Sequence, residues 1–387
     1  MISHRNITLL KWFNFFIDFR LYAPIAIIYF SQITGSFALG MSVFSITMLA
    51  SAFFELPTGV FSDKIGRKNT VILGAVSAVL FSIFYAIGGS FWILAIGAIF
   101  EGLSRAFYSG NNDALLHDTL SELGQEEYYD EHLGKVSATS QMALGIASIL
   151  GGFLAVWSFA FIMWFSVFPQ LLCFILAFFL IEPKIHKVGS GNIYAHLSEA
   201  YKNFITNKKL RLLSLSSILG YGFGEASYQF VPAFYNTLWP VWAIGIAKTM
   251  SNMLATLSFH FSGKLIRRFD GFKVMLVDNI INRIIGITAT AFPTVLSPFF
   301  MSTTSAFYGV VTVARNALMQ KEFTNEQRAT MGSLNALAGS IFFGIVAFIL
   351  GFTADQLSPA KAILILQIFQ IGNLFIYWKL FKHNASS

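Results

Sequence analysis

Apolar runs of membrane-spanning length recur along the whole chain and leave it few ways to fold. A spanning helix needs about 20 residues, and that length yields twelve candidates, at 8–34, 37–62, 69–89, 91–120, 132–157, 159–181, 209–238, 240–267, 272–291, 294–320, 328–356 and 359–381. Only 12% of the 387 residues are charged, about half the share of a soluble domain. Because no water-soluble core hides so much apolar surface, the sequence predicts an all-α membrane protein with twelve transmembrane helices.

The longest polar link, at 182–208, divides these candidates six and six. It begins Glu182-Pro183-Lys184 and contains Gly189-Ser190-Gly191. The sequence therefore predicts an N-terminal six-helix bundle over 1–181, a cytoplasmic linker over 182–208 and a C-terminal six-helix bundle over 209–387. The halves also resemble repeats, since Ala106-Phe107-Tyr108 recurs as Ala306-Phe307-Tyr308. Duplicated bundles of this kind place a binding site near the membrane midplane.

Basic residues set the expected orientation. With a cytoplasmic N-terminus, nearly every lysine and arginine of the links lies inside, and the outer turns hold essentially Lys361. We therefore expect a multi-pass protein of the cell (inner) membrane with both termini cytoplasmic. The net charge of +7 is then a topology signal and not a nucleic-acid surface. The first apolar run holds Lys11, Asp18 and Arg20 and is too long for a signal peptide.

A charged hairpin joins the second and third apolar runs, with the sequence Pro57-Thr58-Gly59-Val60-Phe61-Ser62-Asp63-Lys64-Ile65-Gly66-Arg67-Lys68. Gly59 allows close packing where one helix ends, and Asp63 and Gly66 supply turn chemistry. Arg67 and Lys68 place positive charge at the membrane surface. This spacing resembles the G-x-x-x-D-x-x-G-R-[KR] loop between helices two and three of the major facilitator superfamily of secondary transporters.

The resemblance implies two pseudo-symmetric six-helix bundles that alternate between inward-open and outward-open states. It also implies that Asp63 engages the start of the helix at 328–356, near Arg328–Gly332, where free backbone N–H groups favour an anion. Arg67 would engage an acidic residue at the end of the fourth helix, Asp113 or Asp118. The expected conformational latch therefore consists of Gly59, Asp63, Gly66, Arg67, Asp113 and Asp118.

Buried polar residues mark the expected transport site, because charges inside a membrane tend to face a cavity or a partner. Four polar stripes lie on the first, fourth, seventh and tenth helices, which line the central cavity in the superfamily that the chain resembles. The candidates for binding substrate or protons are Asp18, Tyr22, Glu101, Arg105, Tyr108, Asn112, Tyr221, Glu225, Tyr228, Tyr308 and Arg315. By helical spacing Arg20 points elsewhere. The alternative is that each charge belongs to a static ion pair.

The same spacing leads to a coupling hypothesis. Asp18 and Arg105 fall at similar depth for a rise of 1.5 Å per residue, and Glu101 lies one turn from Arg105. The carboxylates of Asp18 and Glu101 then compete for the guanidinium of Arg105, and the carboxylate that is not paired with it takes up a proton. The static alternative is a permanent Asp18–Arg105 bridge, with Glu101 facing a polar neighbour. The run at 272–291 is also unusually polar, and the sequence assigns no role to its charges.

These observations favour proton-coupled efflux of an amphipathic compound by a functional monomer, with protons or another coupling ion, a small solute and the bilayer as partners. The Gly151-Gly152 pair matches the end of the glycine signature of twelve-helix drug exporters, although Ala147-Ser148 replaces its Gly-Pro. The alternatives are proton-coupled transport of a polar anionic metabolite, and a non-transporting receptor or lipid scramblase. An enzyme is not expected, since no catalytic set, metal cluster, nucleotide loop or cofactor motif occurs. The single cysteine, Cys173, rules out an internal disulfide.

Overall fold

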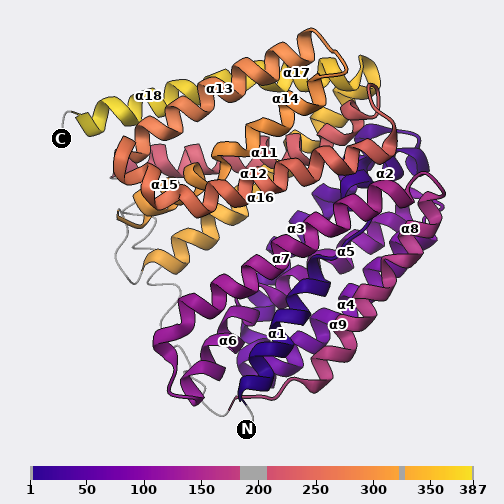
Figure 1. The fold of residues 1–387 in the computed structure, drawn as a ribbon, viewed down its shortest axis with the longest axis vertical. Helices are drawn as coiled ribbons and strands as arrows, with labels where there is room; N and C mark the ends of the chain where they lie inside the picture. The colour runs from indigo at the N-terminus through magenta and orange to yellow at the C-terminus, as the bar shows by residue number, and fades with distance from the viewer. Residues whose placement is uncertain (1–2, 184–206, 322–326, 386–387) are drawn as a thin grey trace. The chain divides into compact units, whose positions relative to one another are not determined.

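Helices make up all of the regular structure in the part of the chain that is described. The computed structural model describes residues 3–183, 207–321 and 327–385, and no strand occurs within them (Figure 1). Nine helical stretches of these ranges are long and apolar enough to cross a membrane. The chain is therefore an all-α, multi-pass membrane protein, and twelve crossings remain a prediction.

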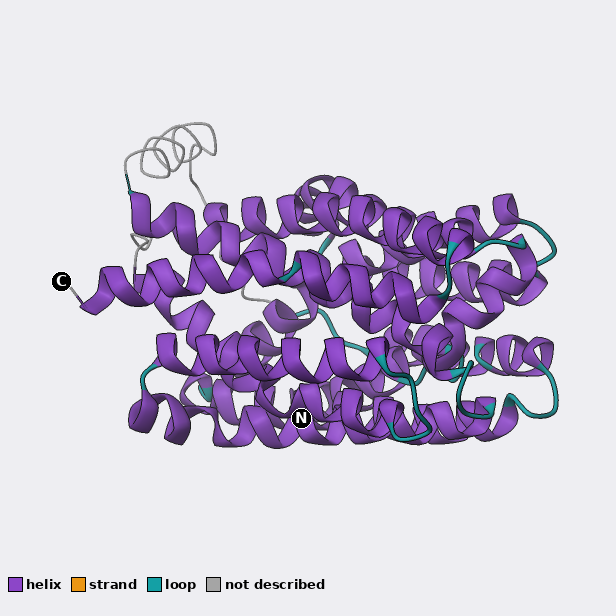
Figure 2. Cartoon of the chain, turned by 90° about the horizontal axis from the view of Figure 1, so that it is seen from above, coloured by secondary structure: helices purple, strands orange, loops and turns teal. Residues whose placement is uncertain are grey.

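Each of the twelve predicted ranges contains helix, and the links that the structure describes between these ranges are short (Figure 2). The first six contain α1 (Ser3–Asp18), η1 (Ala23–Ile25), α2 (Ala26–Thr34), α3 (Phe37–Ile65), α4 (Arg67–Ile87), α5 (Phe91–Tyr108), α6 (Asn111–Glu122), α7 (Tyr129–Leu154), α8 (Phe159–Phe165) and α9 (Val167–Phe179). The short η2 (Glu126–Tyr128) lies between the fourth and fifth ranges. The last six contain α11 (Lys208–Tyr235), α12 (Val241–Phe269), α13 (Gly271–Ala291), α14 (Ser297–Thr303), η3 (Thr304–Phe307), α15 (Tyr308–Lys321), α16 (Gln327–Gln356), α17 (Pro359–Phe369) and α18 (Ile371–Ala385).

Several predicted helices are interrupted. The first breaks after Asp18 and resumes at η1, whose first turn contains Pro24. Proline has no backbone N–H to donate to the preceding turn. The fourth breaks after Tyr108, where Gly110 adopts φ +66°, a conformation that glycine adopts without strain. Residues on either side of such a break no longer follow one helical register.

The chain forms two compact units. Unit 1 comprises Met1–Gly35, Ile46–Gly189 and Val241–Thr249, and unit 2 comprises Ser36–Ser45, Ser190–Pro240 and Met250–Ser387. The units differ from the predicted bundles at two places, because the first turns of α3 belong to unit 2 and the first turns of α12 belong to unit 1. Most of the predicted linker, residues 184–206, lies outside the described residues. The bundle boundaries therefore remain a prediction.

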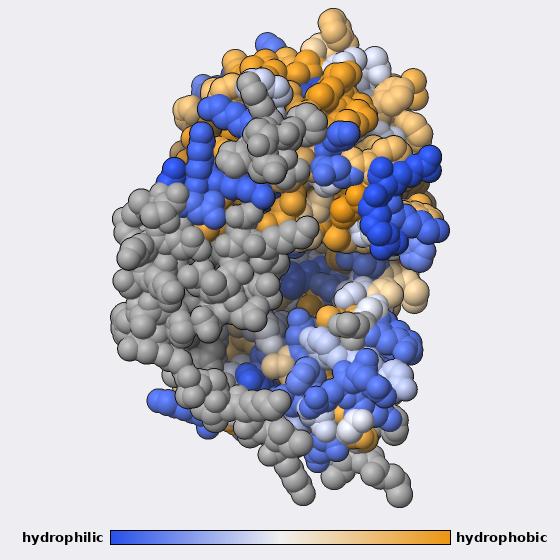
Figure 3. All heavy atoms as spheres, turned by 90° about the vertical axis from the view of Figure 1, so that its left-hand side faces the viewer, coloured by the Kyte–Doolittle hydropathy of each residue, from blue (hydrophilic) through white to orange (hydrophobic). Residues whose placement is uncertain are grey.

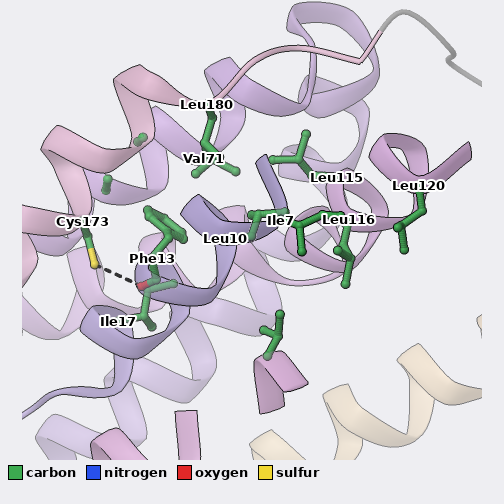
Figure 4. Close-up of a cluster of buried hydrophobic side chains, with 13 residues drawn as sticks. Ile7, Leu10, Phe13, Ile17, Val71, Leu115, Leu116, Leu120, Cys173 and Leu180 are labelled. Carbon is green, nitrogen blue, oxygen red and sulfur yellow. Dashed lines mark hydrogen bonds between the residues drawn. The ribbon is translucent and has the colours of Figure 1, made fainter. Parts of the chain in front are cut away.

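Apolar clusters form the interior of each unit. In unit 1, side chains of α1, α4, α6 and α9 pack together, among them Leu10, Phe13, Val71 and Leu116 (Figure 4). Cys173 is buried in this cluster, with its thiol 3.4 Å from the carbonyl oxygen of Phe13. The core of unit 2 contains Leu210, Leu213, Phe272, Met275, Val310, Ala314, Tyr377 and Leu380.

Many large apolar side chains are also exposed, as expected for helices surrounded by lipid. Trp92, Trp157, Phe292 and Phe369 are each more than 70% exposed. Hydrophilic residues occur together on the face that Figure 3 presents, next to apolar ones. This pattern agrees with a multi-pass protein whose flanks contact acyl chains.

The glycine pair of α7 permits two close backbone contacts within unit 1. A methyl group on Gly151 would overlap the carbonyl oxygen of Leu21, in the break of the first helix. One on Gly152 would come within 2.8 Å of the carbonyl oxygen of Trp242, at the start of α12. Helices approach closely in a membrane where side chains are absent. Both glycines therefore position backbone segments next to α7.

Asp355, near the end of α16, binds the first residues of α3 within unit 2. Its carboxylate accepts hydrogen bonds from the backbone N–H groups of Phe37 (2.7 Å) and Ala38 (3.0 Å) and from the hydroxyl of Ser36 (2.6 Å). The first N–H groups of a helix have no partner within it, and the positive end of the helix dipole favours an anion. Asp355 therefore caps α3 from a distant part of the sequence.

Replacing Asp355 with alanine should loosen the start of α3. We expect a loss of about 1–2 kcal/mol in the free energy of unfolding, the usual cost of removing a helix cap. Amide hydrogen exchange at Phe37 and Ala38 should accelerate, because their N–H groups lose their acceptors. Gln356→Ala, one residue further along α16, is the matched control. Unchanged exchange at both amides in Asp355→Ala would contradict the capping role.

Candidate functional site

The break in the first helix directs Arg20 toward α5. The backbone turns through residues 19–22, with the N–H of Arg20 donating to the carbonyl of Asp18 and that of Ala23 donating to the carbonyl of Arg20. The guanidinium then reaches Glu101, with 2.6 Å between Nη1 and Oε1. The expectation that Arg20 points elsewhere was therefore wrong, because it assumed one continuous helix.

Glu101 is the centre of a buried network in unit 1. Its Oε1 accepts hydrogen bonds from Arg20 and also from Arg105, whose Nη2 and Nε lie at 2.9 and 3.2 Å. Its Oε2 accepts from the hydroxyls of Tyr85 (2.8 Å) and Thr47 (3.4 Å). Glu101 is only 5% exposed, and a buried carboxylate is tolerated when it is paired and hydrogen-bonded. We call these five residues the Glu101 network.

Asp18 lies beside this network without joining it. Its polar neighbours are Arg20, Arg105 and, on α7, Ser140. Among the described residues, no ion pair within 4.0 Å joins Asp18 to either guanidinium. The static alternative of an Asp18–Arg105 bridge therefore does not hold in this structure. Both arginines bind Glu101, and Asp18 is the carboxylate without an arginine in an ion pair.

The remaining candidates of unit 1, Tyr22, Tyr108 and Asn112, lie in three different environments. Tyr22 is buried, with its ring edge-on to Tyr85 at 5.8 Å, so it borders the Glu101 network. Tyr108, the last residue of α5, packs edge-on against Phe13 and next to the apolar core of unit 1. Asn112 belongs to α6, beyond the break at Gly110, and its Oδ1 is buried without a hydrogen-bond partner among the described residues.

The hairpin after α3 is held by two contacts around Arg67. Its Nε lies 3.7 Å from Oδ2 of Asp118, whereas Asp113 is exposed. Gly66 has φ +90° and leaves room for the carboxylate of Glu182. That carboxylate accepts from the backbone N–H groups of Arg67 (2.7 Å) and Lys68 (2.6 Å) and so caps α4. The side chain of Asp63 and the environment of Gly59 are not described, and neither is the expected contact near Arg328–Gly332.

Sequence reasoning missed two residues that contact this hairpin, Asn111 and Glu182. Asn111 accepts from the hydroxyl of Ser62 (2.7 Å) and donates to the carbonyl of Arg67 (3.0 Å). The sequence places Glu182 at the start of the predicted linker and does not indicate which residue it contacts. Gly66 could have indicated such a partner. It has no side chain to cap α4, so the first backbone N–H groups of that helix need an acceptor from elsewhere in the chain.

Unit 2 brings three of its candidates together. Glu225 on α11 accepts from Gln229 at 2.7 Å, and Tyr228 and Tyr308 are its electrostatic neighbours. Tyr308 is 59% exposed and Tyr228 41%. Tyr221 packs against Gly339 of α16. These tyrosines provide accessible aromatic surface next to a carboxylate.

Arg315 on α15 is also an electrostatic neighbour of Tyr308. Its guanidinium lies over Gly220 and donates to the hydroxyl of Tyr377 at 3.3 Å. No cluster of three or more metal-ligating side chains occurs among the described residues.

Comparison with known proteins finds one family over most of the chain. The family described as the Major Facilitator Superfamily matches residues 12–347. An uncharacterized MFS-type transporter of Methanocaldococcus jannaschii is 22% identical over 90% of each chain. A bicyclomycin resistance protein homolog of Haemophilus influenzae is 29% identical over 50% of this chain and 44% of its own length. A match of 27% identity to an uncharacterized transporter of Buchnera aphidicola spans 43% of that protein.

Solved structures resemble the whole chain in fold. The nucleoside transporter NupG superposes with a TM-score of 0.81 at 14% identity, over 97% of this chain and 99% of its own. A bacterial homolog of the human lysosomal transporter Spinster gives a TM-score of 0.77 at 14% identity, over 98% and 97%. At this identity the likeness concerns the fold alone.

Proposed function

Because the chain belongs to the major facilitator superfamily, we propose that it is a proton-coupled transporter that exports a small amphipathic solute. It is a transport protein of the membrane and not an enzyme. The proposal rests on one observation above the others, the sharing of Glu101 by two guanidiniums next to an unpaired Asp18.

The coupling step follows from this arrangement. In the described state Glu101 holds Arg20 and Arg105, and we assign the proton to Asp18, the carboxylate that forms no ion pair with either guanidinium. When rocking of the bundles brings a guanidinium to Asp18, the proton leaves and Glu101 keeps its hydroxyl donors. The switch thus involves two arginines, where the sequence predicted Arg105 alone.

The amphipathic solute is supported by the group around Glu225. Tyr221, Tyr228 and Tyr308 offer aromatic surface, and Glu225 offers a negative charge. The bicyclomycin resistance homolog is a relative consistent with export. An anionic metabolite is the second candidate substrate. Arg20 and Arg105 already bind Glu101, so Arg315 is the candidate arginine that would bind such an anion. We further propose that the protein acts as a monomer in the inner membrane, with cytoplasmic termini.

The Asp18→Asn variant tests the coupling. Proteoliposomes are loaded with a solute selected by a binding screen on the purified protein. Exchange at equal pH on both sides should survive, since Glu101 still pairs both arginines. Accumulation driven by a pH gradient should be lost, because asparagine carries no proton. Glu127→Gln, which alters an exposed carboxylate outside the candidate site and the latch, is the control and should retain both activities.

Gradient-driven accumulation that persists in Asp18→Asn and also in Glu101→Gln would refute proton coupling through this site. The same vesicles, assayed with labelled lipid, separate transport from the scramblase alternative. Lipid flipping without solute movement would overturn the proposed function as a whole.

A further inference from the structure

A second group of charges lies in the interior of unit 2 and shares only Arg315 with the candidates described above. We call it the α13 cluster, and it consists of Asp278, Asn282 and Arg283 on α13, Arg315 on α15 and Tyr377 on α18. Asp278 is 6% exposed and accepts from Nδ2 of Asn282 at 2.9 Å. Tyr377 is 2% exposed and accepts from Arg315. Elements far apart in the sequence thus place two arginines and one aspartate in the same interior.

The guanidiniums of this cluster are not fully hydrogen-bonded. Nε and Nη1 of Arg283 and Nε of Arg315 are buried and have no acceptor among the described residues. Asp278 is an electrostatic neighbour of both arginines, yet no described ion pair within 4.0 Å joins it to either. Two positive charges and one negative charge leave the cluster with a net charge of +1.

Such an arrangement is costly inside a membrane. A guanidinium without a counter-ion is unfavourable there, and a buried donor without an acceptor adds to the cost. A bound anion reduces both costs, since it neutralises the excess charge and accepts the free N–H groups. The planar guanidinium fork matches a carboxylate in particular.

We propose that Arg283 and Arg315 form a binding site for a small monovalent anion, with Asp278 as the internal competitor for their guanidiniums. The anion is either a carboxylate group of the transported solute or a resident inorganic ion. The site is distinct from the Glu101 network, and its test requires no transport, so it fails or succeeds independently of proton coupling.

The test titrates purified full-length protein with sodium acetate or sodium chloride, in a buffer whose other anion is a bulky sulfonate. Calorimetry and the thermal unfolding midpoint report binding. We expect saturable binding and stabilisation in the wild type, both lost in Arg283→Gln and in Arg315→Gln. Arg268→Gln, which removes an exposed arginine at the end of α12, should bind as the wild type does.

Asp278→Asn separates a ligand site from static packing. Loss of the competing charge should lower the dissociation constant of the anion by about tenfold or more, given the size of a Coulomb term at this range. A preference for acetate assigns the site to a solute carboxylate, and a preference for chloride assigns it to a resident ion. Absence of saturable binding of both anions, or unchanged binding in both arginine variants, would overturn the proposal. So would Asp278→Asn binding no tighter than the wild type.

Discussion

The Glu101→Gln variant is expected to lose about 3–5 kcal/mol of unfolding free energy, the usual cost of removing one partner from a buried ion pair. Glutamine keeps an oxygen acceptor but no charge, so two guanidiniums remain in unit 1 without their counter-ion. Arg20 depends on Glu101 more than Arg105 does, because its side chain is 13% exposed and that of Arg105 is 38% exposed. The loss should therefore arise mainly from Arg20.

A double-mutant cycle measures this directly. Glu101→Gln combined with Arg20→Gln removes the more buried of the two guanidiniums left without a counter-ion and should recover more than half of the lost stability. Unfolding is followed by denaturant titration of the purified protein in micelles, with Asp113→Asn as the control. A double variant that loses the sum of the two single effects would show that the pair contributes no coupling energy, and the Glu101 network would then lose its central role.

The Gly151→Ala variant is expected to fold poorly or to lose about 3 kcal/mol or more, at the upper end of the usual cost of overpacking. The added methyl group would overlap the carbonyl oxygen of Leu21. This neighbour is backbone, and a carbonyl in the break of the first helix cannot rotate away as a side chain can. Separation of α7 from that break would also displace Arg20.

Gly145→Ala on the same helix is the matched control, since no atom lies within 4 Å of the position that its added methyl group would take. There alanine should be neutral or stabilising by up to about 1 kcal/mol, because glycine is the poorer helix former. Yield of folded protein and thermal unfolding midpoint distinguish the two variants. Equal behaviour of Gly145→Ala and Gly151→Ala would contradict the close approach to Leu21.

Helix positions were predictable because an apolar run of about 20 residues in lipid satisfies its backbone hydrogen bonds by forming a spanning helix. Pairing along a single helix was predictable too, and Glu101 and Arg105, four residues apart on α5, do bind each other. In both cases the inference used only spacing within an unbroken helix.

Inference failed where a helix breaks or where the partner is distant in sequence. Pro24 marked the interruption that brings Arg20 to Glu101. The spacing of Asp18, Arg20 and Tyr22 was nevertheless interpreted as if one unbroken helix continued through this point. The break at Gly110 likewise separates Tyr108 from Asn112. The caps supplied by Glu182 and Asp355 connect residues more than 100 positions apart, and local pattern carries no information about such pairs.

The exchanged first turns of α3 and α12 have a consequence for how the chain folds during its synthesis. Ser36–Ser45 leaves the ribosome early, but the rest of unit 2 starts only at Ser190. Unit 1 in turn waits for Val241–Thr249 before Gly152 meets its partner. Contacts of such long sequence separation form late and slowly. A nascent chain that ends before Val241 therefore holds two incomplete units. Unit 1 is completed once Thr249 has been added, and unit 2 much later, because its last segment is Met250–Ser387.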